Sequence, residues 1–142
     1  MSQENVEQFR EATEAFNRWA ATPDSDATDS NASAYMRFID PEIQFEPVQA
    51  TLQGRYVGLD GVRAWLGDVA EHYERGNVDY TEIRDLGTHL LAVGTLHVIG
   101  RGSGIEIGVP MAVVASLHDG LITHFKDYGD KDQALEAAGL KE

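Results

Sequence analysis

Residues 77–130 read NVDYTEIRDLGTHLLAVGTLHVIGRGSGIEIGVPMAVVASLHDGLITHFKDYGD, and this stretch decides the fold class. It contains three long segments rich in apolar and β-branched residues, joined by two tight-turn signals, Gly102-Ser103-Gly104 and Asp119-Gly120. Apolar runs separated by short glycine-containing turns are typical of antiparallel strands joined as hairpins. We therefore expect an antiparallel meander of three or four strands in this part of the chain.

The residues before and after this stretch predict helices. Apolar side chains recur at three- and four-residue steps over residues 3–20, which indicates an amphipathic helix. A short helix is expected over residues 31–39, and a brief strand that ends at Pro47 is expected after it. A third helix is expected from about Asp60 to Gly76-Asn77. A last short helix is expected over residues 130–138. Helices followed by a meander predict an α+β domain with helices packed on one face of an antiparallel sheet.

The composition bounds the class of protein. The 142 residues fit a single domain over residues 1–142, with a flexible acidic loop at about residues 21–30. The net charge of −13 would repel nucleic acid and anionic membranes, and no apolar run is long enough to span a bilayer. The sequence has no cysteine, and because its first residues are polar we expect no secretory signal. We expect a cytoplasmic protein that needs no cofactor.

Short motifs follow one another in an informative order. Asp40-Pro41-Glu42-Ile43 enters the expected first strand, Tyr56-Val57-Gly58-Leu59-Asp60-Gly61-Val62-Arg63 leads into the third helix, and Asp119-Gly120-Leu121-Ile122 forms the last turn. With this order and spacing the chain resembles, from end to end, the SnoaL-like branch of the nuclear transport factor 2-like superfamily, to which ketosteroid isomerase-like proteins are related. The resemblance implies a cystatin-like α+β cone, in which a curved antiparallel or mixed sheet wraps around N-terminal helices. It also implies a pocket for a hydrophobic small molecule.

Strand alternation predicts which side chains enter such a pocket. If both turn signals are two-residue loops, Met111 pairs with Gly94 in one hairpin and Val113 pairs with Lys126 in the other. A one-residue slip in either turn would exchange the two faces of the affected strand. In the expected register, the concave face collects an apolar lining: Leu96, Val98, Ile107, Val109, Met111 and Val113. The third helix adds two further candidate ligand-binding residues, Trp65 and Val69.

Glu46 is the candidate proton acceptor. It ends the expected first strand in Phe45-Glu46-Pro47-Val48, and the resemblance places it at the position of the general-base carboxylate of ketosteroid isomerases. A carboxylate against an apolar wall has a raised pKa, which suits proton abstraction. The alternative is a strand-end glutamate whose head group reaches water.

His124, Lys126 and Tyr128 form a second candidate catalytic set. They alternate along the last strand, so they share one face, and in the expected register this face lines the pocket. Such side chains can polarise a carbonyl or hold an enolate. The alternative for His124 and Lys126 is an exposed position near the sheet rim. Asp127 faces away in this register and enters the pocket if the strand is slipped.

The comparison with ketosteroid isomerases also shows a difference. Ala12 and Val113 fall where those enzymes have the tyrosine and the protonated aspartate of their oxyanion hole. Neither side chain can donate a hydrogen bond, and such donors supply much of the transition-state stabilisation. Steroid isomerisation by that mechanism is therefore not expected.

No metal site is expected, because the histidines lack the spacing of a metal motif. Two functions remain open. The first is acid–base catalysis of the isomerase, cyclase, dehydratase or epoxide hydrolase type on a hydrophobic carbonyl compound. The second is a non-catalytic domain that binds an apolar ligand or serves as a dimeric association module. A homodimer is expected through the outer sheet face, at Thr95, His97, Val114 and Phe125.

Overall fold

The computed structural model describes residues 2–23, 30–47, 56–87 and 89–139. Along the chain lie helices α1 (Ser2–Ala21) and α2 (Ser30–Met36), strands β1 (Ile39–Glu46) and β2 (Tyr56–Val57), helix α4 (Gly58–His72), strands β3 (Tyr73–Asp85), β4 (Leu90–Gly100), β5 (Glu106–His118) and β6 (Leu121–Asp127), and helix α5 (Lys131–Ala137). Residues 24–29 of the expected acidic loop lie outside the described residues.

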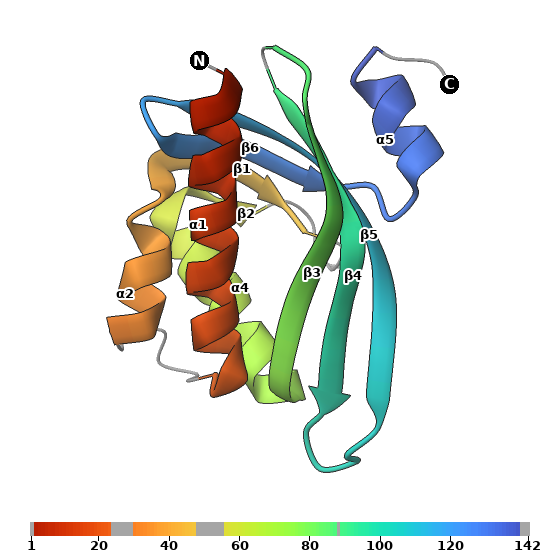
Figure 1. The fold of residues 1–142 in the computed structure, drawn as a ribbon. Helices are drawn as coiled ribbons and strands as arrows, with labels where there is room; N and C mark the ends of the chain where they lie inside the picture. Colours follow the sequence, from red (N-terminus) through yellow and green to blue (C-terminus); the bar gives the residue numbers. More distant parts are fainter. Residues whose placement is uncertain (1, 24–29, 48–55, 88, 140–142) are drawn as a thin grey trace.

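The strands form one curved sheet in the order β2-β1-β6-β5-β4-β3. Strands β1 and β6 run parallel and the other neighbours run antiparallel, so the sheet is mixed. Figure 1 shows the long strands β3, β4 and β5 curving around the side on which α1, α2 and α4 lie, with α5 on the other side. The predicted α+β fold, a curved sheet wrapped around N-terminal helices, is confirmed.

Helix α1 is held against the edge of the sheet. Its predicted apolar stripe is largely buried, with Phe9, Phe16 and Ala20 in the core. The Asn17 side chain also bonds the edge strand β3: its amide nitrogen donates to the Val78 carbonyl (2.9 Å), and its oxygen accepts from the Val78 N–H (2.8 Å). Edge strands leave such backbone groups unpaired. Asn17 therefore satisfies one pair and fixes the helix that forms one wall of the interior.

Helix α5 covers part of the convex face. Asp130 caps this helix by accepting a hydrogen bond from the Asp132 N–H (2.8 Å). The helix then buries two apolar side chains against strands β4 and β5, in a small core separate from the main one: Leu91, Ala112, Ala134 and Leu135. This cover includes Val114, which packs beside the same cluster.

Two predicted helix ends are wrong. Helix α2 ends at Met36, because β1 already begins at Ile39 and pairs with β6 there. Helix α4 ends at His72, and Tyr73 continues with extended backbone (φ −127°, ψ 136°) directly into β3. Gly76, expected to stop the helix, pairs with Val98 instead, and a Cβ on it would lie 3.2 Å from the Val98 side chain. This glycine marks close strand packing rather than a helix end.

The register prediction is right for one hairpin and wrong for the other. In β4–β5, Gly94 pairs with Met111 as expected. In β5–β6, His118 pairs with Leu121 as expected, but the register then shifts by one residue at Thr123, and Val113 pairs with Asp127 rather than with Lys126. A bulge of one residue exchanges the faces of the strand beyond it. Asp127, and Phe125 with it, therefore turns toward the helices.

Strands β3 and β4 approach each other closely at Gly94. This residue pairs with Tyr80, and β3 has a bulge between Tyr80 and Glu82. A Cβ on Gly94 would lie 2.6 Å from the Tyr80 Cα and closer still to the carbonyl oxygen of Asp79. Strand glycines often mark such close backbone approaches, and bulges add local bend. The close approach of the two strands therefore requires a residue without a side chain at this position.

Gly94→Ala should lower the free energy of unfolding by about 1–3 kcal/mol, because the backbone must move to admit the methyl group. Gly108→Ala in the same sheet is the matched control, since its Cβ would meet the Thr95 methyl at an ordinary 3.5 Å. The control should change the stability by less than about 0.5 kcal/mol. Urea denaturation of both variants measures the difference, and equal effects would contradict a special constraint at Gly94.

Candidate functional site

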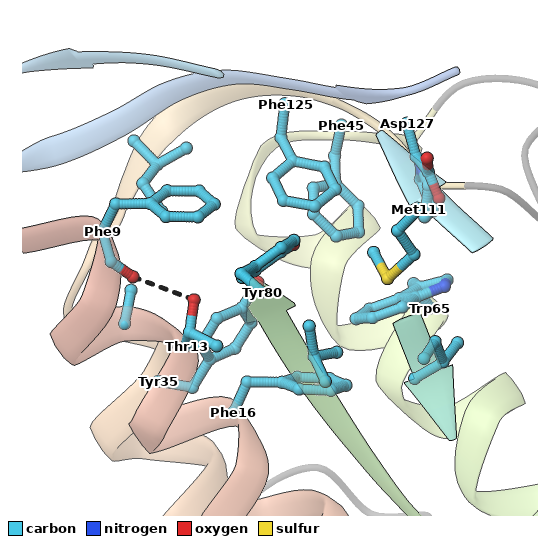
Figure 2. A pocket seen from close by; sticks show the side chains of 15 residues that line it. Phe9, Thr13, Phe16, Tyr35, Phe45, Trp65, Tyr80, Met111, Phe125 and Asp127 are labelled. Atoms are coloured by element: carbon cyan, nitrogen blue, oxygen red, sulfur yellow. Dashed lines mark hydrogen bonds between the residues drawn. The ribbon is translucent and has the colours of Figure 1, made fainter. Parts of the chain in front are cut away.

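A cavity of about 60 Å³ lies between the helices and the concave face of the sheet (Figure 2). The Phe45 ring contacts Trp65 (4.9 Å between centroids) and Phe125 (5.0 Å), which braces the wall. Small-molecule sites are typically apolar hollows with a few placed polar groups. Seven of the fifteen described lining residues are aromatic: Phe9, Phe16, Tyr35, Phe45, Trp65, Tyr80 and Phe125.

Asp127 is the one carboxylic acid among the described residues that line this cavity. It is only 5% exposed. Its Oδ1 accepts hydrogen bonds from the N–H groups of Ala112 (3.0 Å) and Gly129 (2.9 Å). Its Oδ2 is buried and has no hydrogen-bond partner in the described structure. Figure 2 shows the carboxyl group beside Met111 at one end of the cavity.

The surroundings favour the neutral form of this acid. Burial raises the pKa of Asp127, and the two backbone hydrogen bonds offset only part of this rise. Because Oδ1 already accepts two N–H groups, the proton of the neutral form belongs on Oδ2. A protonated Oδ2 can donate to a ligand oxygen, and an ionised one can accept a proton. The geometry thus gives one exchangeable proton position on a residue that lines an apolar hollow.

The other polar groups of the cavity are neutral. Burial raises the pKa of Tyr35, and burial together with the nearby Asp127 charge raises that of Tyr80 well above its ordinary value. Both phenols therefore keep their protons at neutral pH. The Thr13 hydroxyl donates to the Phe9 carbonyl (2.9 Å). The indole Nε1 of Trp65 is buried and has no hydrogen-bond partner in the described structure.

The structure brings together most of the sequence-predicted ligand-binding residues. Trp65, Leu96 and Met111 line the cavity described above. Val69 and Val109 line a second hollow next to it. Val113 is fully buried, but it does not line either hollow; it packs in the core as the strand partner of Asp127.

Glu46 lies on the other face of the sheet from the cavity. Its neighbours Phe45 and Pro47 both line the cavity, and alternation turns the residue between them away. The Glu46 carboxylate lies 3.8 Å from Lys126 Nζ and 4.0 Å from His124 Nε2, and the Glu46 side chain is 20% exposed. The strand pairing Glu46–Lys126 explains this grouping.

The prediction that His124, Lys126 and Tyr128 face the pocket is wrong, and the bulge at Thr123 is the reason. Tyr128 packs instead beside the α5 cluster, with Lys126 Nζ 4.9 Å from its ring centre. The sequence carries one signal for this arrangement. Ile122 and Phe125 are both buried apolar residues of β6, and their spacing of three residues does not fit simple alternation.

The bulge also changes the comparison at Val113. Val113 and Asp127 are direct strand partners, and such partners lie on the same face. Asp127 therefore lies beside the position at which the sequence comparison finds an acid missing. Ala12, at the position compared with the isomerase tyrosine, is buried and lines the cavity.

Two further features are absent from the described residues. No three His, Asp or Glu side chains there come together as a set that could hold a metal ion. None of the helices in the same part of the chain is long and apolar enough to cross a membrane.

Solved structures with the same architecture are numerous at low sequence identity. A protein of the nuclear transport factor 2-like class and of unknown function from Burkholderia pseudomallei has a TM-score of 0.72 at 19% identity, over 94% of this chain and 95% of its own. A protein from Jannaschia sp. CCS1 assigned to the SnoaL-like polyketide cyclases has a TM-score of 0.70 at 16% identity. The match covers 89% of this chain and 85% of that protein. A protein with a ketosteroid isomerase-like fold from Catenulispora acidiphila, in complex with trimethylamine, has a TM-score of 0.64 at 20% identity. The match covers 89% of this chain and 93% of that protein.

These identities support the fold alone. The comparison with curated proteins finds no match. The sequence model of the SnoaL-like domain family matches residues 6–125. This range covers the sheet as far as Phe125 in β6, together with the helices on the concave side of the sheet. The chain belongs to the family of SnoaL-like domains.

Proposed function

We propose that this protein binds a small apolar carbonyl compound in its cavity, and that Asp127 transfers a proton to or from this compound. One observation carries the proposal: a carboxyl group of the cavity lining has one oxygen held by two backbone N–H groups, and its other oxygen is buried without a hydrogen-bond partner. Burying a polar atom without a partner costs free energy. A ligand hydrogen bond to Oδ2 would recover that cost.

The chemistry follows from the raised pKa of Asp127. A general acid or base works best when its pKa lies near the working pH, and burial moves this carboxyl in that direction. The ionised form would take a proton from the carbon next to a carbonyl, and the resulting neutral form would return it. Tyr80 and the Trp65 indole are neutral donors in the same cavity for the ligand oxygen. Reactions of the isomerase, cyclase or dehydratase type use such steps.

Binding without catalysis is the second candidate. Asp127 is the one carboxylic acid among the described lining residues, whereas many acid–base reactions use two proton-exchanging groups. The two candidates differ in one observable, which is proton exchange on a bound ketone.

The first test uses pentan-2-one in D₂O, with proton NMR following loss of the protons next to the carbonyl. Asp127→Asn should slow the protein-catalysed exchange by about 100-fold or more while retaining binding measured by calorimetry. The wild-type rate should rise with pH through a midpoint above the ordinary aspartate value of 3.8, because only the ionised form accepts a proton.

Glu46→Gln is the matched comparison in this experiment, since it removes a carboxylate from the other face of the sheet. Exchange that is lost in Glu46→Gln and kept in Asp127→Asn would restore the assignment predicted from the sequence. Binding of the ketone without any wild-type exchange would favour the non-catalytic candidate.

We also propose a homodimer through the convex face of the sheet. Phe125 turns to the concave side and Val114 packs beside α5, so the interface would use the part around Thr95, His97 and the exposed Pro110. Light scattering at micromolar concentration should give twice the mass of the chain, and His97→Glu should shift the protein toward monomer. A clean wild-type monomer would contradict this proposal.

A further inference from the structure

The cavity at Asp127 has a neighbour. A second hollow of about 60 Å³ is lined by residues of α1, α4, β3, β4 and β5, and it shares Phe16, Trp65 and Leu96 with the first. Its remaining described wall is apolar except for Tyr73. No Lys, Arg or His is found among the described residues that line either hollow.

The two hollows follow one another along the same strand pair. On the concave side of β5, Val113 lies beside Asp127, Met111 lines the first hollow, and Val109 lines the second. Strands advance by about 3.3 Å per residue, so each step of two residues covers about 7 Å. Asp127 therefore lies at one end of this row, and the second hollow extends it away from the acid.

The space is narrow. An engineered apolar cavity of about 150 Å³ is known to hold benzene, and each of these hollows is less than half that volume. The rings between them are braced, since Phe16 stacks on Trp65 at 5.5 Å and also contacts Tyr35. Leu96 is the aliphatic member of the shared wall and is only half-buried. Any ligand of this size needs the wall to yield, and an unbranched chain, which is narrower than a fused ring system, needs the smaller movement beside Leu96.

We propose that the second hollow is a subsite for the tail of an elongated, single-headed ligand. Its neutral head, a carbonyl or hydroxyl group, meets Asp127, and its unbranched aliphatic tail runs past Leu96 to Val109. A carboxylate head is disfavoured, because the described walls offer it no cation and the chain carries a net charge of −13. This inference rests on the proposed binding of a carbonyl compound and names its shape.

The test compares pentan-2-one with undecan-2-one by titration calorimetry. The longer ketone should bind at least about tenfold more tightly, since each buried methylene contributes favourably. Val109→Trp, which fills the second hollow, should remove that advantage and leave the affinity for pentan-2-one within about twofold. Val98→Phe fills the same hollow from β4 and should act alike if Val109→Trp does not fold. Glu71→Trp adds the same ring on the exposed side of α4 and should change neither affinity.

Three results would overturn the subsite. Val109→Trp and Val98→Phe could leave undecan-2-one binding intact, they could weaken both ketones equally, or a fused-ring ketone such as 2-tetralone could bind wild type more tightly than undecan-2-one. The catalytic proposal fails separately. Absence of exchange at Asp127, with the chain-length effect still present, would reject catalysis and keep the subsite.

Discussion

The inserted residue Thr123 in β6 determines which side chains reach the interior of this SnoaL-like domain. Up to the Leu117–Ile122 pair the last hairpin follows simple alternation, and beyond it every residue of β6 is turned over. This change places Phe125 and Asp127 against the helices and places His124 and Lys126 beside Glu46 on the other face. The bulge thus places His124 and Lys126 on one face of the sheet and Asp127, the buried acid of the same strand, on the other.

The free energy that maintains Asp127 in the cavity comes from its neighbours. Burying a carboxyl group is costly, and the two backbone N–H groups of Ala112 and Gly129 repay part of that cost at one oxygen. The rest of the desolvation cost is not offset, because the second oxygen has no hydrogen-bond partner in the described structure. Functional sites often retain such uncompensated polar atoms, because a ligand can satisfy them. Burial of the acid in the low-polarity interior strengthens this effect.

The architecture could be read from the sequence because it depends on long, repeated signals. The apolar period of α1, the glycine-marked turns and the motif order led to the curved sheet, and the β4–β5 register followed from one turn. The helix ends at Met36 and His72 were missed, since Ile39 and Tyr73 suit a strand as well as a helix and tertiary pairing decided between them.

The candidate site was harder to predict, because it depends on a single register. Trp65, Leu96 and Met111 were found by periodicity, whereas Asp127 required knowledge of the bulge. No turn residue encodes an insertion at Thr123, and only the spacing between Ile122 and Phe125 hints at it. The motif position favours Glu46, but its alternation with the buried Phe45 and Pro47 is the stronger physical constraint.

The central claim is that Asp127 is a desolvated acid inside the cavity. Carbon-13 NMR of aspartate-labelled protein, with Asp127→Asn to assign the signal, measures its titration directly. The account predicts a midpoint above the ordinary value of 3.8, together with a shift of this signal when a ketone binds. A midpoint at or below 3.8, unaffected by ketone, would mean an ionised carboxylate in contact with water and would contradict the account.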